Sequence, residues 1–173
     1  MIKVKVTIKG IAPILFHRFP DEDFINQKPK LKGVGLSQED QVEKSLYKTK
    51  EGKIYTPADH IIGAMVKAGA NFNLKGRKTF REVCEAGVFI HPQQIVHKNQ
   101  KYLSDWRSAV NRNNRSRIMV GRGRLDEWGL EFELVCIDQR ATLKDIEDIL
   151  KYAGNYIGIG SYRPRYGRFE VTE

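Results

Sequence analysis

Gly154-Asn-Tyr-Ile-Gly-Ile-Gly-Ser-Tyr-Arg-Pro-Arg-Tyr-Gly-Arg-Phe-Glu-Val171 joins a predicted helix to the last predicted strand of the chain. The stretch contains four glycines, three arginines and four aromatic residues. Glycine lets the backbone approach a bulky partner, arginine offers a planar fork to phosphate, and an aromatic ring offers a stacking face to an unpaired base. The stretch therefore predicts a nucleic-acid-binding loop. The alternative is a tight return between helix and edge strand, with solvated arginines.

The helix before this loop begins with a recognisable capping pattern. In Thr142-Leu-Lys-Asp145 a threonine cap is followed three residues later by an acidic residue. Its apolar face consists of Ile146, Ile149, Leu150 and Ala153, and Gly154 is expected to end it. After the loop, residues 168–172 alternate as a short final strand.

An earlier helix is predicted from Thr56, with this threonine as its cap and Pro57 as its first helical residue. Apolar residues at helical spacing follow, and Gly69 is expected to end the helix. Residues 2–9 alternate strictly between apolar and polar side chains, which is typical of a half-buried strand.

Two further segments complete the core elements: residues 83–90 form a strand candidate, and residues 130–136 alternate as another strand. The resulting order β, α, β, β, α, β predicts an α+β, ferredoxin-like fold, with two helices on one face of a four-stranded antiparallel sheet. The other face is free to meet a ligand. Long insertions follow the first strand and separate the second from the third, within one domain over residues 1–173.

The composition indicates a polyanionic partner. The chain has 30 lysines and arginines against 21 acidic residues, a formal charge of +9 and a pI of about 9.6. Cys84 and Cys136 lie in apolar patterns without the close spacing of a metal or redox pair, so we expect reduced core thiols. No run of about eighteen apolar residues occurs, which predicts a soluble, cytoplasmic protein without a membrane contact.

The strongest charge signal is the segment 107–124, which contains no acidic residue. Its basic residues are all arginines, which favours bidentate phosphate contacts over general solubility. They are Arg107, Arg112, Arg115, Arg117, Arg122 and Arg124. We predict a flexible, RNA-contacting finger that orders on binding.

Catalytic residues are not fixed by any motif. Asp21 and Asp23 lie near His17 in a long charged excursion, where carboxylates with a histidine could perform acid–base chemistry; a solvated loop is the alternative. His60 lies in the first turn of its helix and could be a base or a structural side chain. We predict neither a metal site nor a cofactor.

Two segments resemble motifs of the RAMP superfamily of CRISPR-associated proteins, most closely those of its guide-RNA backbone subunits. Tyr55-Thr-Pro-Ala-Asp-His-Ile-Ile-Gly-Ala-Met65 is similar to the superfamily's helix-start motif, and residues 156–171 to its C-terminal glycine-rich loop. The resemblance implies that this loop lies near RNA and that the insertion 107–124 is a thumb or finger crossing the bound strand. The matching loop positions are Gly158, Gly160, Arg163, Arg165 and Gly167. Some relatives cut RNA with a histidine or with an acidic residue after the first strand.

We therefore expect a protein that binds single-stranded RNA, with single-stranded DNA as a second option, and that assembles either in repeated copies along the strand or in a multi-subunit ribonucleoprotein. The arginines of both segments, with Arg168, would hold the backbone, while Tyr162, Tyr166 and Phe169 would stack on bases or wedge between them. Binding is favoured over enzymatic activity. The alternatives are an RNA-processing endoribonuclease that uses a histidine and a basic protein-interaction module.

Overall fold

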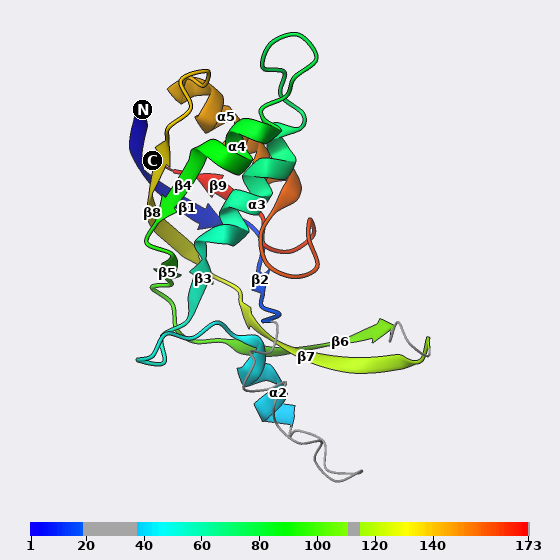
Figure 1. Cartoon of the computed structure of the whole chain (residues 1–173). Helices are drawn as coiled ribbons and strands as arrows, with labels where there is room; N and C mark the ends of the chain where they lie inside the picture. Colours follow the sequence, from blue (N-terminus) through cyan, green and yellow to red (C-terminus); the bar gives the residue numbers. More distant parts are fainter. Residues whose placement is uncertain (19–37, 111–114, 173) are drawn as a thin grey trace, which may run out of the picture.

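The central element of the structure, a computed structural model that describes residues 1–18, 38–110 and 115–172, is a four-stranded antiparallel sheet (Figure 1). Its strand order is β4-β8-β1-β9. The bounds are β1 Ile2–Gly10, β4 Val88–His91, β8 Gly129–Cys136 and β9 Phe169–Val171. Numbered by their order along the chain, these strands run 2-3-1-4, as in the ferredoxin-like split arrangement. The α+β prediction is confirmed.

Helices cover one face of this sheet (Figure 1). The two predicted ones are α3 (Ala58–Gly69) and α5 (Leu143–Tyr152). The apolar side chains of β1 and β8 point into the core beneath them, including Val6, Ile8, Leu130 and Leu134, all buried. The alternation read from the sequence therefore gives the correct inward face for both strands. At α5 the capping box between Thr142 and Asp145 is present, and α3 ends at Gly69 as predicted.

The opposite face of the sheet carries paired charges of both signs. Lys3 forms an ion pair with Glu133 at 3.0 Å, and Lys98 forms another with Glu131. Both pairs involve exposed side chains, so they contribute little to stability. Because basic and acidic groups alternate there, this face is less suited to a polyanion than the segment described next.

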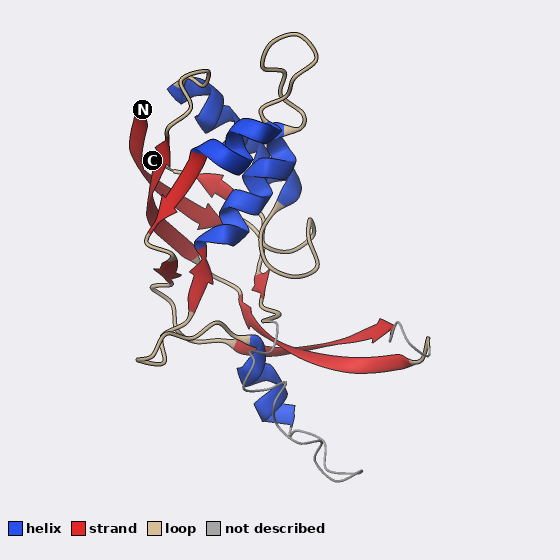
Figure 2. Cartoon of the chain, in the orientation of Figure 1, coloured by secondary structure: helices blue, strands red, loops and turns tan. Residues whose placement is uncertain are grey.

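A long β-hairpin, β6 (Leu103–Val110) and β7 (Arg117–Leu125), extends away from the sheet and helices (Figure 2). The finger predicted over 107–124 is a two-stranded hairpin in its described residues, because eight cross-strand pairs link the two strands from Leu103↔Arg124 to Val110↔Arg117. The short strand β2 (Ile14–Leu15) pairs with β7 and attaches the hairpin to the body. Helix α2 (Gln38–Ser45) packs against the hairpin, where Gly121 and Gly123 leave room for Val42 and Leu46.

Three local predictions are corrected by the structure. Residues 81–87 form helix α4 and only 88–91 continue as strand β4. Thr56 does not cap α3; it belongs to β3 (Tyr55–Pro57), which pairs with β5 (Gln94–Val96), and its hydroxyl hydrogen-bonds His97 at 2.8 Å. Gly154 does not end the last helix, because a π-helical turn, η1 (Ala153–Ile157), follows α5.

Candidate nucleic-acid interface

The glycine-rich loop begins after η1 and folds back tightly on itself. At Gly167, φ is +72° and a Cβ would lie 1.7 Å from the Ile159 carbonyl oxygen, so only glycine fits. At Gly160, φ is +81° and a Cβ would lie 2.6 Å from the Leu15 carbonyl oxygen. The Ser161 amide donates to that same carbonyl at 2.8 Å. These glycines therefore hold the loop against β2, and the loop's arginines are left exposed.

Tyrosines of the loop contact arginines of the hairpin, although the contacting residues lie at least 40 positions apart in the sequence. The Arg107 guanidinium lies 4.5 Å from the centroid of the Tyr166 ring and also donates a hydrogen bond to the Tyr166 hydroxyl. The Tyr162 ring lies 5.6 Å from Arg107 and 4.8 Å from Arg122. Cation–π contacts of this kind stabilise by about 0.5–2 kcal/mol each. Loop and hairpin thus form one surface.

A single aspartate organises the arginines at the base of the hairpin. Asp105 binds Arg107 through two hydrogen bonds of 2.5 and 2.9 Å and Arg124 through one of 3.2 Å. The hydrogen bond from Arg107 is the largest of the effects that lower the pKa of the Asp105 carboxyl. Arg124 also binds Asp126, at 2.6 Å. Because few carboxylates serve several guanidinium groups, the surface stays positive.

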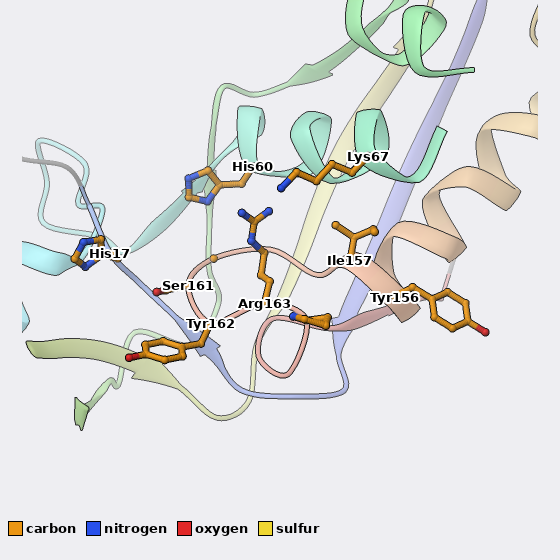
Figure 3. Close-up of a pocket in the computed structure, with 10 residues that line it drawn as sticks. His17, His60, Lys67, Tyr156, Ile157, Ser161, Tyr162 and Arg163 are labelled. Carbon is orange, nitrogen blue, oxygen red and sulfur yellow. The ribbon is translucent and has the colours of Figure 1, made fainter. Parts of the chain in front are cut away.

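A cleft of about 600 Å³ runs from α3 to the loop. Four of the described side chains that line it, His17, His60, Lys67 and Arg163, are cationic or can become so. The Asp59 carboxylate lines the adjoining cavity together with His60, Lys67 and Arg163. Figure 3 shows His60, Lys67 and Arg163 close together beside α3. His17 and Tyr162 lie further along the cleft, on the left of the view. Such a cleft matches the chemistry of a phosphate-bearing ligand.

The two histidines that line the cleft have lowered pKa values, which favours their neutral form. Burial, and secondarily the charge of Arg163, lowers the pKa of His60, although Asp59 opposes this effect. Desolvation and then Arg122 lower the pKa of His17. The His60 Nδ1 atom is buried and has no hydrogen-bond partner. A ligand phosphate in the cleft would favour protonation of both rings.

The structure brings most of the predicted residues to one side of the molecule and leaves others apart or untested. The cleft and its border include His17, His60, Tyr162, Arg163 and Tyr166, with Arg107, Arg122 and Arg124 behind them. Arg115 and Arg117 are exposed on the hairpin, and Arg165 and Arg168 on the loop. Gly158 and Gly167 are buried. The prediction that Phe169 stacks on a base is wrong, because its ring is fully buried in the core. Arg112, Asp21 and Asp23 lie outside the described residues.

Sequence reasoning missed Lys67 and Asp105. Lys67 lies seven residues, or about two helical turns, after His60 on α3. This spacing could have predicted that both side chains lie on one face of the helix. Asp105 precedes the arginine segment by two residues, so alternation along a strand would have set it beside Arg107.

Over the part of the chain that the structure describes, no group of three or more His, Cys, Asp or Glu side chains could hold a metal ion. Both cysteines are free and buried, as expected, and burial raises the pKa of Cys84 to about 12. No helix among the described residues is long and apolar enough to cross a membrane.

Comparison with solved structures identifies the fold. A chain of the Type III-B Cmr-beta complex bound to cognate target RNA matches 98% of this chain with a TM-score of 0.57 and 14% sequence identity. Cmr6 from Pyrococcus furiosus matches 99% of this chain, and 98% of its own length, with a TM-score of 0.52 and 9% identity. The chain shares the fold of these two proteins.

This shared fold agrees with the resemblance seen in the two sequence motifs. The chain spans only 59% of the length of the Cmr-beta chain, so that larger protein contains regions without a counterpart here. No protein-family model and no curated protein matches the sequence. With identities of 14% and 9%, the shared property is the fold.

Proposed function

We propose that this protein binds single-stranded RNA as a subunit of a CRISPR-type ribonucleoprotein, along a path formed by the β6–β7 hairpin, the glycine-rich loop and the cleft beside α3. The observation that carries the proposal is the contact between Arg107 and Arg122 of the hairpin and Tyr162 and Tyr166 of the loop. It places cationic and aromatic groups on one surface, the combination that single-stranded nucleic acids require.

Two further observations support this path. The cleft is lined by His17, His60, Lys67 and Arg163, with Asp59 as the acidic group of the adjoining cavity, whereas the open face of the sheet carries ion pairs of both signs. The positive charge that remains without an acidic partner is therefore expected mainly at the loop and the hairpin. One structural neighbour is described as bound to target RNA, which is consistent with RNA as the ligand.

Salt dependence of binding tests the proposal. If about five phosphates are neutralised, the logarithm of the association constant should fall with the logarithm of salt concentration with a slope of about −3.5. Fluorescence anisotropy with a labelled oligouridine measures this slope, and a DNA oligonucleotide of equal length tests the preference for RNA. A flat salt dependence would exclude this mode of binding.

The loop arginines give the first mutational prediction. The exposed pair Arg163 and Arg165 contributes charge without supporting the core. In R163A/R165A the salt slope should become less negative by about 1.4, since two phosphate contacts are lost. The control R77A/R81A removes two exposed arginines outside the hairpin and loop and should bind like the wild type. Equal affinity of both folded double variants would count against the loop.

A second candidate function is metal-independent RNA cleavage. The cleft brings His17 and His60 together with Lys67 and Arg163, so a neutral histidine could take a proton from a 2′-hydroxyl while the cations stabilise the phosphate. Incubation of labelled RNA with excess EDTA, using the wild type, H17A and H60A, distinguishes the functions. Product that disappears in H60A indicates cleavage, and intact RNA in all three indicates binding alone.

Assembly is tested separately by measuring the mass of the protein–RNA complex on strands of increasing length. Stepwise addition of one chain per fixed number of nucleotides would indicate repeated copies along the strand. A single bound chain, independent of length, would indicate that other subunits complete the particle. Competition by an acidic polypeptide as strong as that by RNA would instead favour a protein-interaction module.

A further inference from the structure

Arg122 is an unusually placed arginine. Among the lysines and arginines of the described residues it alone is buried, with 6% of its surface exposed. Its Nε and Nη1 atoms are inaccessible to solvent and have no hydrogen-bond partner. Taking a charged group out of water without pairing its donors is strongly unfavourable. Such a group is therefore a candidate for pairing with a ligand.

The nearest carboxylate does not pair with these donors. Asp105 lies directly opposite Arg122 in the register of the hairpin, but its two oxygens accept from Arg107 and Arg124. On the side of the cleft, His17 is near enough for the charge of Arg122 to lower its pKa, after desolvation. The contact that Arg122 does make is with the Tyr162 ring, at 4.8 Å.

The Tyr162 ring lies over Arg122 and, less closely, over Arg107. Its backbone has a φ of +57°, a conformation that a non-glycine residue adopts at a cost. Its side chain is 39% exposed, and its hydroxyl donates to the Ser108 carbonyl at 3.3 Å, a long hydrogen bond. Tyr162 also lines the cleft. The ring thus separates the cleft from the Arg122 guanidinium.

We propose that Arg122 binds one backbone phosphate of the RNA, and that the Tyr162 ring, which covers Arg122 in the free protein, moves away to admit that phosphate and stacks on a neighbouring base. The guanidinium fork suits two phosphate oxygens, and the displaced ring exchanges a cation–π contact for a base-stacking contact. This inference rests on the proposed RNA binding and adds an internal anion site to it.

Replacing an arginine that binds a ligand should weaken ligand binding without lowering the stability of the free protein. Replacing an arginine that stabilises the fold should lower that stability. In R122M the apolar side chain removes an unpaired buried charge, so the RNA-free variant should unfold at the same or a higher urea concentration than the wild type. Its affinity for oligouridine should fall about tenfold, the expected loss of hydrogen bonds to a charged group. The salt slope should become less negative by about 0.7.

The matched control is R81M, because Arg81 is an exposed arginine on α4, outside the hairpin, the loop and the cleft lining. It should leave the urea midpoint unchanged and weaken binding by no more than about threefold. A lower urea midpoint for R122M, or an affinity within about threefold of the wild type, overturns the internal site. An R122M chain that does not fold overturns it as well, since the arginine would then be structural.

A second variant, R122K, keeps the charge and the aliphatic stem but lacks the planar fork. We expect R122K to fold and to bind about fivefold more weakly, with an unchanged salt slope. Full affinity in R122K excludes forked recognition of a phosphate. If the wild type itself does not bind RNA, the proposed function fails; if it binds and R122M binds equally well, only the internal site fails.

Discussion

The buried residue His97 connects two small elements of the fold. Its ring hydrogen-bonds the Thr56 hydroxyl at 2.8 Å and packs edge-on against Phe16 and Trp128. Only 2% of its surface is exposed, and this burial lowers its pKa to about 4. A neutral imidazole is thus part of the folded state at neutral pH.

Acid should destabilise the protein through His97. The unfolded chain binds a proton below about pH 6.5, whereas the folded ring resists protonation until about pH 4, so stability is lost as the pH falls between these values. We expect the free energy of unfolding to decrease by about 2.5 kcal/mol from pH 7 to 4.5 through this group. Urea unfolding of the wild type and H97Q at both pH values measures it. An equally large decrease in H97Q would show that other groups are responsible.

At the scale of elements, the sequence patterns correctly predicted those strands and caps that depend on neighbouring residues. The alternation in β1 and β8 and the capping box at Thr142 are set by residues within a few positions of one another. The cap expected at Thr56 failed because His97, 41 positions away, takes its hydroxyl. Arg81–Gly87 is too short for its spacing of apolar residues to distinguish helix from strand.

The hairpin was missed for a different reason. The face of β7 that packs against α2 presents glycines rather than apolar side chains, since Gly121 and Gly123 leave room for Val42 and Leu46. The opposite face presents arginines that meet the loop. Neither face shows the apolar alternation typical of a strand. Charge predicted that the segment contacts a ligand, but not its conformation.

Contact between Tyr166 and Arg107 should couple the loop and the hairpin energetically. The pair combines a hydrogen bond with a ring contact at 4.5 Å. A double-mutant cycle with R107A, Y166A and R107A/Y166A, measured by urea unfolding, should give an interaction energy of about 1 kcal/mol. The pair Arg140 and Tyr156, which have no contact with each other among the interactions described, serves as the control cycle and should be additive. Additive losses in the first cycle would show that loop and hairpin are independent.

At the scale of the molecule, basic side chains that form ion pairs and basic side chains that line the cleft lie in different places. Lys3 on the sheet and Lys98 in the loop after β5 have acidic partners on β8, whereas the cleft brings Lys67 and Arg163 together with two histidines. Burial, and secondarily the charges of Arg163 and Arg122, lowers the pKa of His60 and His17 and keeps them neutral in the free protein. A polyanion in the cleft would stabilise the protonated imidazoles and raise their pKa, so its binding should be accompanied by proton uptake.

RNA affinity should therefore rise as the pH falls. In the free protein the pKa of His60 is lowered by burial and by Arg163, with Asp59 opposing, and that of His17 by desolvation and by Arg122. A bound phosphate raises both pKa values, so affinity increases as the pH falls through the bound-state values, by up to about tenfold per pH unit for each ring protonated. Anisotropy titrations between about pH 8 and 6 avoid most of the acid destabilisation expected from His97.

Variants assign this proton uptake to particular rings. H60Q and H17Q should each reduce the pH dependence of binding, while H91Q, which changes an exposed histidine on β4 outside the cleft, should retain it. Affinity that is constant with pH in the wild type, or that rises with pH, would mean that the phosphates do not approach the histidines. RNA would then follow the hairpin alone, and the cleft beside α3 would have to serve a different ligand.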